Sequence, residues 1–165
     1  MYWRFHAQAA GLVRCRLSMS SGDLDCQLGG DVLQAERIAT DPAAAARQYL
    51  ASDNIGDRTR GIQALGEVGD DHARDQLIDI ALDAKQPQAR RTAVKVLGKI
   101  RGPGVVAAVS RVLLYDRFDE VRQAAATALG QLRDPAAREA LQRAEAGDSS
   151  ARVQVLAAEA LTQLP

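Results

Sequence analysis

The sequence predicts an all-α fold in which pairs of helices stack side by side into an α-α superhelix. The first observation is a Leu-Gly pair that recurs every 32 residues, at Leu65-Gly66, Leu97-Gly98 and Leu129-Gly130, with Leu161-Thr162 as an imperfect fourth copy. The second is that apolar residues around each copy recur at the spacing of one helix face. A single helix pair cannot bury such faces alone, so the fixed period predicts an array of repeats.

Other columns of residues keep the same register. An arginine stands seven residues before the Leu in the first three copies, small residues stand four before it, and large apolar residues stand three and twelve after it. These columns are Arg58, Arg90, Arg122 and, in the last copy, Gln154; Gly61, Ala93, Ala125 and Ala157; Val68, Ile100, Leu132 and Leu164; and Leu77, Val109 and Leu141. We interpret the apolar columns as the positions at which repeats stack on one another.

The register also gives the bounds of the expected elements. The repeats span about 55–83, 87–115 and 119–146, with helices near 55–68 and 71–83, 87–100 and 103–115, and 119–132 and 135–146. A closing helix is expected near 149–164, and a half-repeat that caps the array is expected at 30–52, with a helix from Thr40-Asp41-Pro42 to Leu50. The helical-repeat domain thus covers residues 30–165.

Residues 1–29 have a different pattern, which predicts a small β-hairpin. Apolar and polar residues alternate on both sides of Ser21-Gly22. With the turn at that pair, Leu17 faces Cys26 and Cys15 faces Leu28, so no disulfide is expected. Because a hairpin alone is marginally stable in water, it either packs on the helices or is the tail of a sheet whose other strands are missing. In the second case the chain is a fragment of a longer protein.

The composition limits the classes of partner. The 21 basic and 21 acidic residues balance, which argues against a general nucleic-acid binder or a protein of anionic membrane surfaces. No stretch approaches the roughly 20 apolar residues that cross a bilayer, and the N-terminus lacks an apolar core of signal-peptide type. The two cysteines provide neither a zinc-finger nor a disulfide framework. We therefore expect a cytoplasmic protein, without a membrane, nucleic-acid or small-molecule partner.

The motif formed by Val121-Arg122, an Ala-rich helix, Leu129-Gly130, Asp134-Pro135 and Leu141 resembles the short HEAT-like repeats first noted in phycobilisome lyases. The resemblance covers about residues 55–164. Earlier copies depart from it, since Asp57 replaces the Val in the first and Gly102-Pro103 replaces the Asp-Pro in the second. It implies an interaction scaffold, so the leading prediction is a non-catalytic protein that binds another protein through its concave face.

A second resemblance concerns residues 25–132. The order of Gly29-Gly30-Asp31-Val32-Leu33, Gln48-Tyr49-Leu50 and the segment 116–122 is similar to the junction between the β-sandwich and the C-terminal helical repeats of some bacterial gluzincin aminopeptidases. It implies the C-terminal helical region of a zinc aminopeptidase, inactive without its catalytic domain, because the chain has no HExxH motif. The first resemblance implies a further alternative, a bilin-lyase-like tetrapyrrole attachment factor.

Candidate catalytic and metal-binding residues are few. His6 and His72 cannot form a zinc site with each other at any recognised spacing, and we interpret them as surface or interface residues. Cys15 has no base beside it in the sequence pattern and is interpreted as a buried apolar side chain. We therefore predict that the chain is not an enzyme and uses no metal or other cofactor.

The arginine column permits a phosphate-binding interpretation, but a structural one is favoured. Arg58, Arg90 and Arg122 each begin a first helix, beside turn acids such as Asp70 and Asp134. A planar guanidinium suits a carboxylate at an interface. These arginines are therefore predicted to join neighbouring repeats.

The second helices usually line the concave face of such arrays, so the residues that vary there are candidates for binding. They are predicted to form a mixed, mildly basic groove for an acidic peptide or protein segment, with a solvated polar face as the alternative. The groove residues are Arg74, Asp79, Arg111, Arg138 and Arg143. Tyr115 and Phe118 are possible anchors, although Phe118 also suits a role in covering the core between the second and third copies.

Overall fold

The computed structural model describes residues 4–5, 13–17, 24–28 and 42–165, and the chain divides into two compact units, Met1–Ala45 and Ala46–Pro165. In the first unit, three strands form an antiparallel sheet in the order β1-β2-β3. The strands are β1 (Arg4–Phe5), β2 (Val13–Leu17) and β3 (Leu24–Leu28).

The predicted hairpin corresponds to β2 and β3, but the predicted register is wrong. Cys15 is paired with Cys26, and Leu17 with Leu24. The prediction instead set Leu17 against Cys26, which is a shift of two residues. Such a shift leaves every side chain on its own face, so the alternation of apolar and polar residues fits both registers. The predicted register followed from the turn assumed at Ser21-Gly22, and these two residues lie outside the described residues. The observed register removes the reason given against a disulfide.

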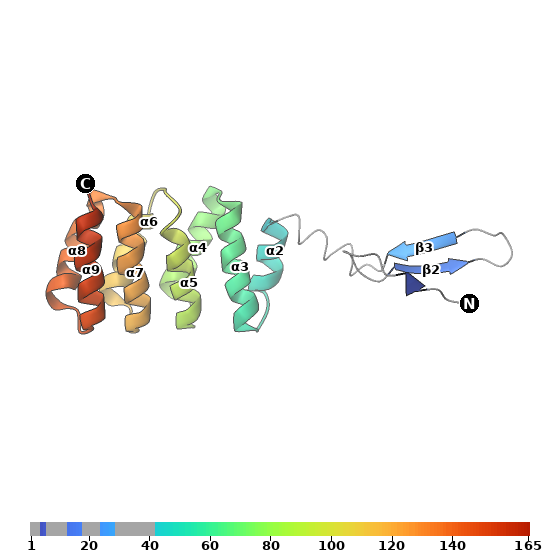
Figure 1. Ribbon diagram of the computed structural model, residues 1–165, viewed down its shortest axis with the longest axis horizontal. Coiled ribbons are helices and arrows are strands. Elements are labelled where there is room, and N and C mark those ends of the chain that lie inside the picture. Colours follow the sequence, from blue (N-terminus) through green and yellow to red (C-terminus); the bar gives the residue numbers. More distant parts are fainter. Residues whose placement is uncertain (1–3, 6–12, 18–23, 29–41) are drawn as a thin grey trace. The chain divides into compact units, whose positions relative to one another are not determined.

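Residues 42–165 fold into helices arranged in two rows (Figure 1). The first-helix row consists of α3 (Ile55–Val68), α5 (Pro87–Leu97), α7 (Asp119–Leu132) and α9 (Ala151–Gln163). The second-helix row consists of α4 (Asp71–Asp83), α6 (Val105–Tyr115) and α8 (Arg138–Gly147), with the short 3-10 helix η1 (Pro135–Ala137) before α8. Helix α2 (Pro42–Leu50) precedes the array. Each helix packs on the next one of its row, and the two rows pack on each other.

This arrangement confirms the predicted all-α superhelix, while two helix ends in the second repeat differ from expectation. Helix α5 ends at Leu97 rather than near residue 100, and α6 begins at Val105 rather than near residue 103. The connection contains Gly104, whose φ of 79° is left-handed, so a right-handed helix begins only after it. Of the predicted half-repeat at 30–52, the described part is α2 and the residues after it.

The repeated apolar columns form the core between the rows. Leu97 and Leu129 of the first-helix row are completely buried, as are Leu77, Val109 and Leu141 of the second-helix row. Burying one such side chain stabilises the fold by about 1.5–3 kcal/mol. Because each repeat supplies the same positions, the core continues from one helix pair to the next.

The glycine after each Leu allows neighbouring helices of the first row to approach closely. A methyl group on Gly98 would lie 2.9 Å from the Cβ of Ala128, and one on Gly130 would lie 3.1 Å from the Cβ of Ala160. Both distances are shorter than normal carbon contacts. In α9 the column holds Thr162, which is exposed.

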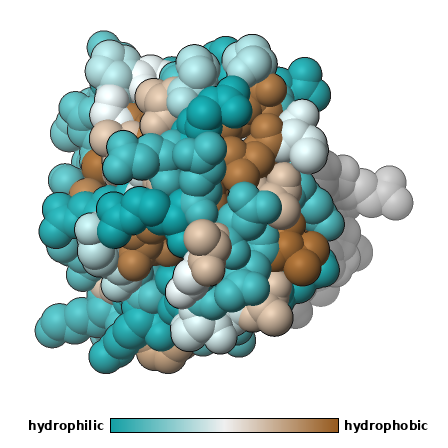
Figure 2. Space-filling view, turned by 90° about the vertical axis from the view of Figure 1, so that its left-hand side faces the viewer, coloured by the Kyte–Doolittle hydropathy of each residue, from teal (hydrophilic) through white to brown (hydrophobic). Residues whose placement is uncertain are grey.

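The face shown in Figure 2, on the α8 and α9 side, is mostly hydrophilic, and its apolar patches are separated by polar residues. Val155 of α9 is 48% exposed. Among the described residues, no helix is both long and apolar enough to span a membrane.

Candidate functional site

Two arginines of the repeated column form ion pairs with aspartates at the junctions between repeats. Arg90 in α5 donates from Nε and Nη2 to the two carboxylate oxygens of Asp116, at 2.6 and 2.9 Å, and from Nη1 to the carbonyl oxygen of Ala84, at 2.7 Å. Arg122 in α7 does the same to Asp148, at 2.8 and 2.9 Å, and to the carbonyl oxygen of Asp116, at 2.8 Å. Both arginines are buried. We call this column the arginine ladder, and its members are Arg58, Arg90, Arg122 and Gln154.

Each ladder aspartate also begins the next helix of the first row. Asp116 Oδ1 accepts a hydrogen bond from the backbone N–H of Phe118 at 2.9 Å, and Asp148 Oδ1 accepts one from Ser150 at 2.8 Å. One carboxylate thus connects the end of a second-row helix, an arginine of the same repeat and the start of the following helix.

These pairs are ionised. Burial alone would raise the pKa of Asp116 and of Asp148, but the hydrogen bonds from the arginine and from the backbone N–H outweigh it, so the pKa of both carboxyls is lowered. The pKa of Arg90 and of Arg122 is raised, chiefly by the hydrogen bond to the aspartate. The ladder pairs are therefore structural and do not exchange protons near neutral pH.

The predicted role of Arg90 and Arg122 in joining repeats is confirmed, but their predicted partners are wrong. Asp70 and Asp134 accept hydrogen bonds from backbone N–H groups at the start of α4 and of η1. Their short side chains are used to cap their own helices. The true partner of each arginine lies 26 residues further along the chain.

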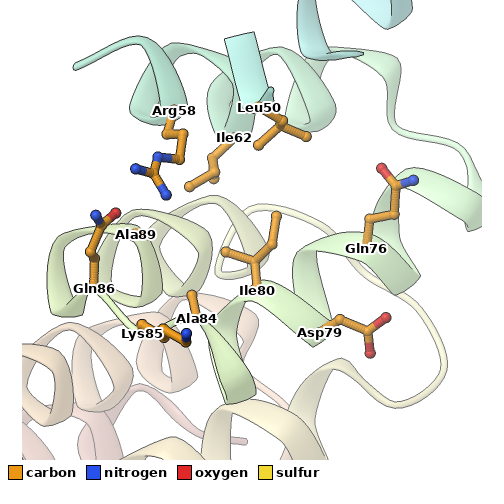
Figure 3. A pocket seen from close by; sticks show the side chains of 10 residues that line it. All are labelled: Leu50, Arg58, Ile62, Gln76, Asp79, Ile80, Ala84, Lys85, Gln86 and Ala89. Carbon is orange, nitrogen blue, oxygen red and sulfur yellow. The ribbon is translucent and has the colours of Figure 1, made fainter. Parts of the chain in front are cut away.

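Arg58 differs from the other ladder arginines. Its Nη2 donates to the carbonyl oxygen of Asp53 at 2.9 Å, but Ala84 occupies the position that Asp116 and Asp148 occupy in the later junctions. Its Nε is buried and has no hydrogen-bond partner among the described residues. A hollow of about 510 Å³ lies beside it, between α3, α4 and the start of α5 (Figure 3). Its apolar lining consists of Leu50, Ile62, Ile80, Ala84 and Ala89.

The structure distributes the predicted groove residues over separate hollows. Asp79 lines the hollow beside Arg58. Arg111 lines a hollow of about 420 Å³ between α4 and α6, and Arg143 lines one of about 540 Å³ between α6 and α8. Arg111 and Arg143 are both exposed.

Two other groove residues are held by contacts within the chain. Arg74 has 12% of its side chain exposed and pairs with Asp71 and Asp75 on α4. Arg138 is exposed and donates to the carbonyl oxygen of Pro165 at 2.7 Å. Both are therefore less available to a partner than Arg111.

The second-helix row is not uniformly basic. Helix α4 exposes an aspartate on every turn, so this part of the row is acidic. The stripe consists of Asp71, Asp75, Asp79 and Asp83. The exposed arginines lie on α6 and α8, where Arg143 is accompanied by the exposed Glu139. The basic groove stays a prediction. Helix α6 is basic through Arg111, whereas in α8 Glu139 and Glu145 balance Arg138 and Arg143.

The two proposed anchors differ in exposure. Tyr115 at the end of α6 is 69% exposed and lines the same hollow as Arg111. Phe118 is 37% exposed, and its ring centre lies 5.6 Å from the guanidinium carbon of Arg90 and 4.7 Å from that of Arg117. Phe118 thus packs over a ladder arginine, and Tyr115 presents its ring to solvent.

Sequence reasoning missed a basic hollow of about 360 Å³ on the first-helix row, over α5, α7 and α9. Its cations are Arg91, Lys95, Lys99 and Arg152. Oε2 of Glu120 lies 3.9 Å from Nη1 of Arg91. The signal was present in the sequence, since Arg91, Lys95 and Lys99 follow one another at four-residue intervals.

Among the described residues, no group of three or more His, Cys, Asp and Glu side chains is placed to hold a metal ion. His72 is exposed on α4, and its Nε2 lies 3.0 Å from the side-chain nitrogen of Gln76.

A family model of HEAT repeats matches residues 43–126 and 109–165. The chain belongs to the HEAT-repeat family. The match covers the described helices from α2 onward, and it confirms the family resemblance that the Leu-Gly columns indicated. No curated protein sequence matches this HEAT-repeat chain significantly.

Two solved structures are similar to this HEAT-repeat chain. Human deoxyhypusine hydroxylase in complex with glycerol has 26% sequence identity and a TM-score of 0.63, over 74% of this chain and 43% of the hydroxylase chain. The complex of CpcE and CpcF of phycocyanin lyase from Nostoc sp. PCC7120 has 23% identity and a TM-score of 0.62, over 79% of this chain and 87% of that chain. This HEAT-repeat chain thus spans less than half the length of the hydroxylase.

The prediction that the chain is not an enzyme is contradicted by these comparisons. One similar structure is a hydroxylase and the other belongs to a lyase. The prediction treated the HEAT-repeat fold as a sign of a non-catalytic scaffold, but proteins with this fold include enzymes.

Proposed function

We propose that this HEAT-repeat chain binds a segment of another protein on its second-helix row, at the hollow that contains Arg111 and Tyr115. The observation that carries the proposal is an aromatic side chain that is 69% exposed and lines the same hollow as an exposed arginine. Tyr and Arg are enriched among the residues that contribute most to protein interfaces.

The charges around this hollow favour an acidic segment. Lys85, Arg111 and Arg117 line it and form no ion pair among the described residues, whereas Asp83 is the one unpaired acid of its lining there. Opposite charge on the partner would speed association and orient the segment. Arg143 lies in the next hollow along the row, whose lining also contains Asp134 and Glu139, so the charge that favours an acidic segment is concentrated at the hollow of Arg111.

Part of the lining of this hollow is preorganised. Arg90 and Asp116 line it and are held together by two hydrogen bonds, of 2.6 and 2.9 Å. A surface that is already ordered loses less conformational entropy on binding. The complex of CpcE and CpcF offers general support, because there a chain similar to this one occurs in a two-protein assembly.

The experiment compares partner capture by the unchanged protein and by two variants, Tyr115→Ala and Arg111→Ala. The captured protein is identified from an extract of the native organism, purified, and its affinity is measured by titration. We expect each variant to bind about tenfold more weakly or worse, which corresponds to roughly 1.4 kcal/mol. Val155→Ala, which removes an exposed apolar side chain on α9, is the matched control. Equal affinity of all variants would contradict the proposal.

A second candidate function is that the chain is a subunit of a lyase-type enzyme that attaches a tetrapyrrole. The observation that favours it is the match to 87% of a phycocyanin lyase chain. Incubation with a tetrapyrrole, followed by desalting and an absorbance spectrum, tests it. Retention of a visible band by the protein would support this function, and loss of the band on desalting would remove it.

A further inference from the structure

We propose that the hollow beside Arg58 is a carboxylate-binding site, in which an external carboxylate takes the place that Asp116 and Asp148 take in the later junctions. The site exists because the ladder has its arginine at the first junction but lacks its acid. The two hollows share Ala84 and Lys85, but Arg58 lines only this one, and Arg111 and Tyr115 line only the other, so the proposal does not depend on the function proposed above.

The backbone at Ala84 is arranged as it is at the two ladder aspartates. The φ and ψ angles are −60° and 129° at Ala84, −69° and 133° at Asp116, and −66° and 141° at Asp148. In each case the backbone N–H donates to the carbonyl oxygen of the residue four positions earlier. A carboxylate on residue 84 would therefore point to the same place as in the other junctions, and with Ala84 that place holds no side chain beyond the methyl group.

The donors that the missing acid would satisfy are present. Arg90 and Arg122 use Nε and Nη2 for the carboxylate. In Arg58, Nη2 already donates to the carbonyl oxygen of Asp53, whereas Nε is buried without a partner among the described residues. The backbone N–H of Gln86, which takes the place of those of Phe118 and Ser150, also donates no hydrogen bond among the described residues. Buried donors without an acceptor are costly, and a carboxylate is the acceptor that this arrangement fits.

The other residues that line the hollow indicate what kind of group the carboxylate would carry. Figure 3 shows Ile62 and Ile80 pointing toward each other across the hollow, with Arg58 on the side of Gln86 and Asp79 on the far side. Arg58 and Lys85 outnumber the single acid of the lining, so an anion is favoured. A volume of about 510 Å³ accepts a carboxylate that carries a short apolar group.

The experiment follows the Nε–H signal of Arg58 in NMR spectra of the full chain. The probes are hexanoate, with hexanamide as its neutral control, and a blocked peptide of aspartate between two leucines, with an asparagine version as its control. We expect a saturable shift of the signal with a carboxylate and none with the neutral controls. Arg58→Gln should weaken binding, followed on the backbone amides around the hollow, by about tenfold or more.

Ala84→Asp supplies the missing acid from within the chain. We expect this variant to melt several degrees higher and to lose the response to both carboxylate probes, because its own carboxylate occupies the site. In an Arg58→Gln background the same change should give no stabilisation, since the pairing partner is absent. This double variant separates the proposed pairing from a general effect of an added charge.

The two probes distinguish the sources of the carboxylate. A response to the peptide alone would assign the site to a protein side chain, and a response to hexanoate alone would assign it to a small acid; either result supports the site. No response to either probe, or an equal response in Ala84→Asp, would overturn the proposal. Loss of partner binding in Tyr115→Ala alone would leave this result unchanged, so the two proposals fail separately.

Discussion

A buried guanidinium in this chain is stable where a carboxylate reaches it along one edge. Arg90 and Arg122 are each less than a tenth exposed, and each donates two hydrogen bonds to one aspartate. Removing a charged group from water costs several kcal/mol, which the attraction and the hydrogen bonds of a well-formed pair can offset. Such pairs fix the register of one repeat on the next.

Breaking one ladder pair should therefore be costly. Asp116→Asn removes the charge that Arg90 faces and leaves that arginine buried without a counter-ion. We expect the free energy of unfolding to fall by about 3–5 kcal/mol, measured by urea denaturation. Asp83→Asn, on the exposed side of α4, should change it by no more than about 0.5 kcal/mol. Equal effects of the two substitutions would contradict the role of the ladder.

The same pairs predict how stability depends on pH. The pKa of Asp116 and of Asp148 is lowered in the folded chain, so the unfolded chain binds more protons in the acid range. Their contribution is complete above the ordinary aspartate pKa of about 3.9 and is lost as the pH falls through the lower folded-state pKa. Melting temperatures measured between neutral pH and pH 3 should drop more steeply for the unchanged protein than for Asp116→Asn. Parallel curves would contradict this account.

At the residue scale, the sequence revealed the arginine column but not its acids. Column spacing identifies which residues are equivalent, whereas the partner of Arg90 comes from the far end of the next helix and follows no local rule. Asp70 and Asp134 stood nearer in the sequence and were the wrong choice, because a short acid before a helix serves its backbone N–H groups first. The exception at Ala84 is meaningful only once the pairing of the other junctions is known.

At the scale of the helices, close packing in the first row depends on small residues at fixed places. Gly98 lies against Ala128, and Gly130 lies against Ala160, each on the next helix of the row. The period predicted these glycines as members of the repeat, but it did not say that they face a neighbouring helix. For the hairpin, the sequence pattern predicted the two strands but not their register, since an alternating pattern cannot distinguish registers that differ by two residues.

A matched pair of glycine substitutions tests this packing. Gly98→Ala places a methyl group 2.9 Å from the Cβ of Ala128, so α5 and α7 must move apart. We expect a loss of about 1–3 kcal/mol in the free energy of unfolding, measured with urea. Gly147→Ala adds the same group in open space, with no atom within 4 Å, and should be neutral or stabilising by up to about 1 kcal/mol. A loss of the same size in both variants would exclude close approach as the cause.

At the scale of the whole helical array, the residues that repeat and the residues that vary differ in burial. Residues that repeat in every copy, such as Leu97 and Leu129, are buried, and residues that vary between copies, such as Arg111 and Arg143, are exposed. The family could therefore be predicted from the sequence, because its signal is the repetition itself. The candidate site could be predicted only as a set of variable positions, since which of them share a hollow depends on how the helices pack.

Reversing a charge on the second-helix row should affect partner binding without affecting stability. Arg143→Glu changes an exposed side chain on α8, so the melting temperature should stay nearly unchanged. If the hollow of Arg143 belongs to the binding surface, partner capture should fall, because an acidic segment would then meet a negative charge. Unchanged capture would limit the surface to the hollow of Arg111 and Tyr115.

A substitution in the core at the centre of the array should, in contrast, abolish stability. Leu129 is completely buried in α7, which packs on α5, α6 and α9. Leu129→Asp puts a carboxylate at this junction without a partner, a cost of several kcal/mol that the fold of a short array cannot absorb. Because each repeat is stabilised mainly by its neighbours, loss of α7 separates the helices before it from α8 and α9. Calorimetry should show no cooperative melting transition for this variant, whereas a transition of normal enthalpy would mean that the repeats fold independently of this contact.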